Sequence, residues 1–174
     1  MRPSLAFLAL LALPVMALAG APQPRKTLDL DRFMGRWYEV LRIPNMAEQN
    51  CHAAHQDWTA AGDGNFMILQ TCHGDSDDGP ERHVKTPARL IDPVTKAKFE
   101  ASFFGGLIHR RYWVIDHSDN YGWMIACTDD GKYVSVLTRS PEVPATEISD
   151  LKSRTGRLGL AAERLVFVGR QPPG

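Results

Sequence analysis

The chain has 174 residues, of which 44% are hydrophobic and 9% aromatic, which suits one folded domain and excludes a wholly disordered chain. Its 20 Lys and Arg residues balance 20 Asp and Glu residues, so the net charge at pH 7 is zero. A neutral chain lacks the basic surface with which nucleic-acid-binding proteins neutralise phosphates, and no repeat of solenoid or propeller type is visible in the sequence.

Residues 1–19 have the layout of a secretory signal peptide. Arg2 supplies a basic start, residues 5–13 (LAFLALLAL) are a continuous apolar run, and the tripeptide ALA at 17–19 is a small-x-small cleavage pattern. The apolar run is shorter than the roughly 20 residues that span a bilayer, which argues against a transmembrane anchor. We therefore expect export, cleavage after residue 19, and one mature domain over residues 20–174.

The mature chain reads as short strands separated by turn residues. Residues 28–34 form a brief helical lead-in. Eight segments of strand length follow, at residues 36–43, 51–60, 65–73, 82–91, 97–104, 109–117, 122–128 and 132–139. Their even spacing between Gly, Asp, Asn and Pro clusters predicts an all-β sandwich or barrel. One helix is expected at 145–155, because Gly156 follows it and basic residues lie in its last turn, and a short strand is expected at 164–168.

Two of the three cysteines flank the predicted hairpin at residues 51–73. Gly62-Asp63-Gly64 provides a turn that reaches positive φ, and pairing across this turn brings Cys51 and Cys72 to within a small register step of each other. In an exported protein this spacing predicts a Cys51–Cys72 disulfide, which would contribute about 3 kcal/mol of stability. Cys127 is left over, and we expect it to be a small buried hydrophobe.

A metal site is the alternative for this corner, since His52, His55 and His73 lie beside the two cysteines. On a strand, however, His52 and His55 have opposite parity and point to opposite faces. The close cysteine pairs typical of zinc sites are also absent from the sequence. The spacing favours the disulfide, and we expect no metal.

Residues 98–103 alternate between apolar and polar side chains. Phe99, Ala101 and Phe103 must share a face that points to an apolar interior, with the intervening residues outward. An eight-stranded barrel has an interior that side chains can fill or that can hold one small ligand. The alternation leaves both of these open.

Three short motifs resemble those of the lipocalin family. Gly35-Arg36-Trp37 matches the G-x-W opening, and Asp119-Asn120-Tyr121 is similar to the second motif, with Ser118 where the family prefers Thr. Arg139 matches the Arg of the third motif. The similarity extends over residues 28–171 and is greatest to the bacterial outer-membrane-type members and to apolipoprotein D. It implies an all-β fold: an eight-stranded antiparallel up-and-down barrel with one C-terminal α-helix and a final short strand.

The resemblance implies structural roles for Gly35, Trp37, Tyr121 and Arg139. In the family the Trp packs at the closed end of the barrel and the Arg lies against it in a cation–π contact. Many bacterial members also carry a lipid-anchor Cys at the cleavage site, where this chain has Gly20. We therefore expect a soluble periplasmic protein, with at most peripheral contact with the outer membrane.

The function implied by the resemblance is non-enzymatic binding and storage or transport of a fatty acid, lysophospholipid or phospholipid, in maintenance of envelope lipids. Each buried methylene contributes about 0.8 kcal/mol, so a long acyl chain can outweigh an association cost of several kcal/mol. The expected lining residues are Glu39, Leu41, Phe99, Ala101, Phe103, Tyr112 and Val114. Ordinary barrel core is the alternative for each, and the strand holding Tyr112 and Val114 can be oriented either way.

Other classes of function stay open at this point. The sequence has no nucleophile elbow, zinc-protease or phosphate-loop motif, so we expect neither enzyme activity nor a cofactor. Catalysis on a bound lipid would need a perturbed acid such as Glu39 or Asp116. Tetrapyrrole binding would use His109 or His117 as an axial ligand, and a filled barrel would instead bind a protein through its loops. The expected partner is a small hydrophobic ligand, bound by a monomer or a weak homodimer.

Overall fold

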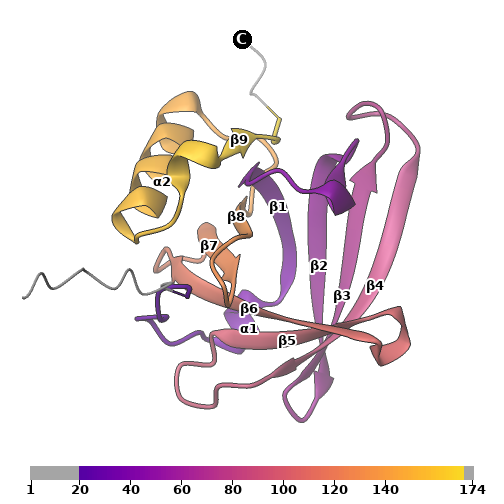
Figure 1. Ribbon diagram of the computed structural model, residues 1–174, viewed down its shortest axis with the longest axis vertical. Coiled ribbons are helices and arrows are strands. Elements are labelled where there is room, and N and C mark those ends of the chain that lie inside the picture. Colours follow the sequence, from indigo (N-terminus) through magenta and orange to yellow (C-terminus); the bar gives the residue numbers. More distant parts are fainter. Residues whose placement is uncertain (1–19, 171–174) are drawn as a thin grey trace, which may run out of the picture.

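A β-sheet closed on itself, with one long helix packed outside it, makes up the fold (Figure 1). The computed structural model describes residues 20–170, so the predicted signal peptide lies outside the described residues. The strands are β1 (Gly35–Arg42), β2 (His52–Gly62), β3 (Asn65–His73), β4 (Glu81–Leu90), β5 (Lys98–Phe103), β6 (Ile108–His117), β7 (Trp123–Thr128), β8 (Val134–Thr138) and β9 (Val166–Phe167). All eight predicted strand segments are confirmed, with ends that differ by a few residues.

The barrel closes through β1. Consecutive strands from β1 to β8 pair antiparallel, and β1 also pairs with β8 from Tyr38 to Arg42. Only the first half of β1 pairs with β2, since at Leu41 and Arg42 the neighbour is β9. The fold is therefore an eight-stranded antiparallel up-and-down barrel with an extra short strand bonded outside it.

Two α-helices and three short 3-10 turns complete the part of the chain that the structure describes. The α-helices are α1 (Leu30–Phe33) and α2 (Ala145–Arg157), and the turns are η1 (Met46–Glu48), η2 (Phe104–Gly106) and η3 (Ala162–Arg164). The predicted C-terminal helix is confirmed and ends two residues later than expected, whereas the final strand is reduced to Val166–Phe167. Within the described residues, no helix combines the length and apolar character needed to cross a bilayer.

The closed end of the barrel is built around Trp37. Its indole Nε1 donates a hydrogen bond to the Phe33 carbonyl at 2.9 Å, which fixes α1 across the barrel bottom. The Arg139 guanidinium lies 3.7 Å from the centroid of the Trp37 ring and donates to the carbonyls of Arg32, Phe33, Met34 and Arg36. Gly35 has φ of 94°, and a Cβ there would lie 3.5 Å from Arg139.

Tyr121 completes this end from the β6–β7 connection. Its hydroxyl accepts a hydrogen bond from the backbone N–H of Asp29 at 2.7 Å, directly before α1. Its ring stacks on His117 and lies under the guanidinium of Arg32. The chain segment that enters the barrel is therefore attached at both Trp37 and Tyr121.

A second apolar cluster lies outside the barrel, beneath α2. The outward side chains of β1, β6, β7 and β8 pack there against Leu151 of α2 and against the chain that follows it. Beside this cluster, Arg154 Nε donates to the Asp116 carboxylate at 2.6 Å. The helix is thus held by apolar packing and by an ion pair at its edge.

The barrel opens at the end opposite α1. β4 pairs with β5 only from Ala88 to Leu90, so the part of β4 nearer its start has β3 as its neighbour but no pairing with β5. Figure 1 shows the β5–β6 hairpin running in a different direction from β4 beyond this point. From Glu81 to Pro87, β4 therefore has an edge that is not paired with β5.

Candidate ligand site inside the barrel

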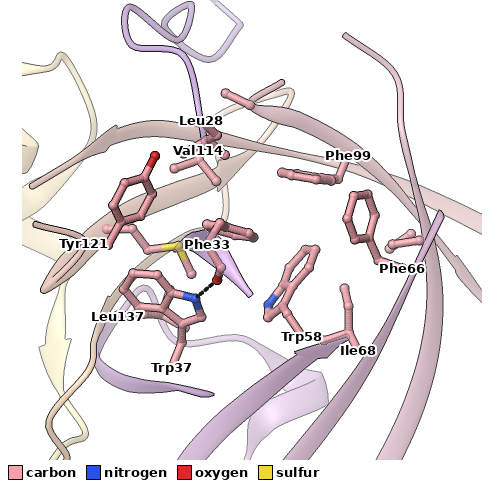
Figure 2. Packing of buried hydrophobic residues seen from close by; sticks show 14 residues of the cluster. Leu28, Phe33, Trp37, Trp58, Phe66, Ile68, Phe99, Val114, Tyr121 and Leu137 are labelled. Carbon is pink, nitrogen blue, oxygen red and sulfur yellow. Dashed lines mark hydrogen bonds between the residues drawn. The ribbon is translucent and has the colours of Figure 1, made fainter. Parts of the chain in front are cut away.

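The floor of the barrel interior is an aromatic cluster. Phe33 and Trp58 have ring centroids 5.0 Å apart, Trp58 and Phe99 5.1 Å, and Phe66 and Phe99 5.4 Å, in edge-to-face arrangements (Figure 2). These separations are contact distances for aromatic rings. The floor is consequently packed with side chains from α1, β2, β3 and β5.

Above the floor, the inward-facing side chains become polar. The strand register identifies them: Gln56 is opposite Trp37, Gln70 is opposite Gln56, and Thr86 is opposite Ile68, all on the face that bears the aromatic floor. On the other side of the barrel, Tyr112 is opposite Phe99. We name as the polar tier the inner-face residues Glu39, Arg42, Gln56, Gln70, Thr86, Tyr112 and Ser135.

Glu39 and Arg42 form the charged part of this tier. Arg42 Nη1 donates to Glu39 Oε2 at 2.9 Å, and Ser135 Oγ donates to Glu39 Oε1 at 2.6 Å. Arg42 Nη2 donates to the carbonyl of Cys51 at 2.7 Å. Burial, reinforced by the negative charge of Glu48, raises the pKa of Glu39 to about 7 against the opposing effects of Arg42 and Ser135.

Glu48 extends this network toward the mouth. Its Oε2 accepts a hydrogen bond from the Tyr133 hydroxyl at 2.9 Å and lies 3.7 Å from Arg42 Nη1. Burial and the Glu48 carboxylate raise the pKa of Tyr133, which keeps this phenol protonated. Two carboxylates and one guanidinium are thus gathered on one side of the interior.

On β4 and β6 the inner face becomes exposed toward the mouth, whereas on β1 Glu39 and Arg42 stay buried. On β4 the exposed fraction rises from 0% at Thr86 to 51% at Val84, and on β6 from 5% at Val114 to 44% at Ile108. The β5–β6 turn beyond is apolar and open to solvent, with Phe104 77% and Leu107 85% exposed. We name as the apolar rim the residues Met46, Val84, Phe104, Leu107 and Ile108.

Most of the predicted lining residues lie on this inner face. Phe99, Ala101 and Val114 belong to the floor cluster, and Phe103 and Tyr112 pack against it. This settles the orientation of β6, with Tyr112 and Val114 inward. Glu39 is also inward, opposite Leu137 of the same cluster.

Leu41 is the exception, and its predicted inward direction is wrong. The pairing of β1 with β8 shifts register between Glu39 and Leu41, which reverses the parity of the following residues. Leu41 consequently packs in the cluster beneath α2, and Arg42 takes the inward position. The other residues of the polar tier are not predicted from the sequence, because only the strand pairing brings them to one face. The parity of Gln56 with Trp58, and of Gln70 with Ile68, is the kind of signal that points to them.

The predicted disulfide pair lies at the mouth end of β2 and β3. Cys51 and Cys72 are both thiols in the structure, and burial together with the hydrogen bond to Cys72 raises the pKa of Cys51 to about 12. Their proximity is compatible with a disulfide, which stays a prediction. Among the described residues, no three His, Cys, Asp or Glu side chains are grouped so as to hold a metal ion.

The residues suggested for other activities lie elsewhere. His109 is on the outer face of β6, 3.8 Å from Glu100, and His117 stacks on Tyr121 at the closed end. Asp116 is paired with Arg154 outside the barrel. Of the four groups suggested for catalysis or for haem ligation, which are Glu39, His109, Asp116 and His117, only Glu39 faces the barrel interior above the floor.

A shallow hollow of about 630 Å³ lies on the outer wall of β4, β5 and β6. Its central acid, Glu100, accepts hydrogen bonds from Arg89 at 2.7 Å and from Arg111 at 3.3 Å. These bonds lower the pKa of Glu100. Because its ionic groups already satisfy one another, the barrel interior is the better candidate for ligand binding.

Comparison with known proteins agrees with this architecture. A family model described as a lipocalin-like domain matches residues 28–170. Mouse apolipoprotein D is 28% identical over 152 residues, covering 83% of this chain and 78% of its own. The outer membrane lipoprotein Blc of Vibrio cholerae is 22% identical over 169 residues, covering 95% of this chain and 98% of its own.

Solved structures show the same fold at lower identity. Insecticyanin from the tobacco hornworm superimposes with a TM-score of 0.67 at 16% identity, covering 86% of this chain and 85% of its own. Lobster apocrustacyanin A1 gives a TM-score of 0.62 at 10% identity, covering 92% and 94%. With the barrel, the sealed Trp37 end and the family match over nearly all of the described residues, the chain belongs to the lipocalin family.

Proposed function

We propose that this protein binds one small lipophilic molecule inside its barrel and stores or transports it in the maintenance of envelope lipids. The observation that carries the proposal is the inner face of the barrel, which is closed by Trp37 and Arg139 at one end and opens at the other onto the apolar rim. Candidate ligands are fatty acids, lysophospholipids and phospholipids. Relatives named apolipoprotein D and outer membrane lipoprotein Blc support a lipid as the ligand.

The proposed location is the periplasm, reached by the signal sequence at residues 1–19. Gly20 follows the predicted cleavage site, where a lipid anchor would need Cys, so membrane contact would be peripheral. We propose binding without catalysis, because the one perturbed acid in the interior, Glu39, is held by Arg42 and Ser135. The protein would act as a monomer or a weak homodimer.

Native mass spectrometry and organic extraction of protein purified from its export compartment test this function directly. A co-purifying lipid, and a change in Trp fluorescence on titration with lysophospholipid, are expected. Gln70 is half-buried on the inner face, so the larger side chain of Gln70→Trp should occupy the space of the ligand and abolish lipid binding. Leu69→Trp, at the adjacent outward position, should retain lipid binding. The absence of any bound lipid, with no response to titration, would sink the proposal.

A further inference from the structure

Polar and apolar levels inside the barrel are stacked in an order that bears on how a lipid enters. An apolar tail binds most favourably against apolar side chains, because removing each methylene from water is favourable. Here the deepest apolar part is already occupied: Phe33, Trp58 and Phe99 contact one another at ring separations of 5.0 to 5.7 Å. A tail entering first would have to displace this packed cluster.

The next level offers hydrogen bonds rather than apolar surface. Thr86 is 0% exposed, points to the interior beside Ile68, and its Oγ1 has no hydrogen-bond partner among the described residues. Gln70 is a diagonal neighbour of Thr86 across the β3–β4 pairing, and it is half-buried on the same inner face. A buried hydroxyl without a partner is costly and rare in native proteins. A polar group of a ligand at this level would satisfy it.

Apolar surface returns beside Gln70, whose partner on β4 is Val84, and continues to the mouth. Val84 lies one inward position beyond Thr86 on β4 and is 51% exposed, and Ile108 is 44% exposed on the facing strand β6. Phe104 and Leu107 continue this surface on the β5–β6 turn. An acyl chain that extends outward from the polar tier would lie along these side chains.

We propose that a single-chain lipid enters the barrel with its head group first. The head group is hydrogen-bonded to Thr86 and Gln70, and the acyl chain extends outward along the apolar rim. This inference rests on the proposed function and specifies how its ligand is oriented. It places the polar atoms of the lipid deepest and leaves the aromatic floor intact as a stop beneath them.

The charges around the polar tier define the class of head group. Glu39 and Glu48 place two carboxylates on one wall, and the Arg42 guanidinium between them already donates to Glu39 and to two backbone carbonyls. Arg110 and Arg82 are exposed cations at inner-face positions of β6 and β4, and they lie nearer the mouth than Tyr112 and Thr86 on the same strands. A head group without net charge, such as a glycerol ester or a phosphocholine, avoids the repulsion that a free carboxylate would meet from Glu39 and Glu48 in the polar tier.

Nitroxide quenching of Trp58 distinguishes the two orientations. Trp58 lies in the floor next to the tier, with its Nε1 donating to Gln56 Oε1 at 3.1 Å. Two lysophosphatidylcholines are compared, one with the nitroxide next to the ester and one with it at the chain terminus. The fluorescence of Trp58 is obtained by subtracting the fluorescence of the Trp58→Phe variant from that of the natural chain. We expect several-fold stronger quenching from the nitroxide beside the ester. Equal quenching, or the reverse order, overturns the inference.

Native mass spectrometry of the same mixtures separates this failure from that of the proposed function. If the labelled lipids bind and the quenching order is reversed, the head-first orientation is wrong and lipid binding stands. If neither lipid binds at any concentration, the proposed function fails, and the orientation with it.

A matched pair of variants tests the contact at Thr86. Thr86→Val keeps the shape of the side chain and removes Oγ1, so lysophosphatidylcholine should bind about fivefold more weakly, as expected for one lost hydrogen bond. Thr59→Val, on the exposed outward face of β2, should leave binding unchanged. Equal affinities for the natural chain and Thr86→Val, with both proteins folded, contradict the proposed contact.

The class of head group is tested with a monoacylglycerol and a fatty acid of the same chain length above pH 8. The monoacylglycerol should bind more tightly than the fatty acid, and the reverse order refutes the assigned head-group class.

Discussion

Arg139 lies with its guanidinium 3.7 Å from the centroid of the Trp37 ring while donating hydrogen bonds to four backbone carbonyls around α1. One side chain thereby joins the end of β8, the start of β1 and the helix that covers the barrel bottom. A planar guanidinium can stack on the indole while its five donors bond to carbonyls around its edge, whereas an ammonium has three donors and no planar face.

Replacement of Arg139 should therefore destabilise the fold strongly. Arg139→Ala leaves those carbonyls without their donor and is expected to lower the unfolding free energy by about 3 kcal/mol, with Arg139→Lys intermediate. Urea denaturation measures this. Arg157→Ala, on the exposed end of α2, is the control and should change stability by less than about 0.5 kcal/mol. A fully stable Arg139→Lys variant would contradict the role given to the planar guanidinium of Arg139.

Glu39 should make stability depend on pH in the acid to neutral range. Its pKa is raised from 4.5 to about 7 in the folded chain, so the unfolded chain ionises first as the pH rises. The favourable contribution of this carboxyl is therefore complete below pH 4.5 and is lost as the pH rises through about 7. Relative to Glu39→Gln, the natural chain should lose roughly 3 kcal/mol of stability across this window. Parallel stability curves for the two proteins would show that the pKa is not raised.

Cys51 and Cys72 should oxidise to a disulfide in protein taken from an oxidising compartment. Thiol titration of the denatured, unreduced protein is expected to find one free thiol per chain, that of Cys127. Reduction, or Cys72→Ser, should lower the unfolding free energy by about 3 kcal/mol. Cys127→Ser serves as the control and should leave the response to reductant intact. Detection of all three thiols in such protein would exclude the bridge.

Replacement of Leu41 should affect stability, whereas replacement of Tyr112 should affect ligand binding. Leu41→Ala removes a side chain buried beneath α2 and should cost about 3 kcal/mol of stability while ligand affinity is retained. Tyr112→Ala, on the inner face, should weaken lysophospholipid binding instead. Denaturation and fluorescence titration of both variants give the comparison, and loss of affinity in a folded Leu41→Ala protein would place Leu41 in the site after all.

The apolar rim should govern lipid uptake from membranes. Phe104→Ser and Leu107→Ser, at side chains 77% and 85% exposed, are expected to slow transfer from phosphatidylcholine vesicles several-fold without altering stability. Val94→Ser is a matched control, because Val94 is 79% exposed on the β4–β5 connection at the other end of the barrel. Equal transfer rates for all three variants would show that the rim is not the entry.

Local patterns in the sequence predicted most of the fold because strands and turns carry local signals. Alternation in residues 98–103 correctly put Phe99, Ala101 and Phe103 on or against the inner cluster, since successive side chains on a strand point to opposite faces. The Gly62-Asp63-Gly64 turn correctly joined β2 to β3. In the same way, the basic residues in the last turn of the C-terminal segment and Gly156 after it predicted α2.

The site was only partly predictable, because its polar groups come from strands distant in the chain. Glu39 and Ser135 are 96 residues apart in sequence and meet through a hydrogen bond only because β1 pairs with β8. Thr86 gave no signal at all, since a single Thr in a strand is more often solvated than buried.

The strands and their turns follow from the sequence alone, because alternation and turn residues involve neighbours a few positions apart. The roles of Gly35, Trp37, Tyr121 and Arg139 follow from the resemblance to the lipocalins, since the contact of Arg139 with Trp37 joins distant parts of the chain. Only the strand pairing in the folded protein shows which residues of β1 face the interior of the barrel. The register shift between Glu39 and Leu41 inserts one unpaired residue, and a shift of one residue reverses every side chain that follows. That reversal exchanges an expected Leu41 for Arg42 inside the barrel and makes the level above the aromatic floor polar.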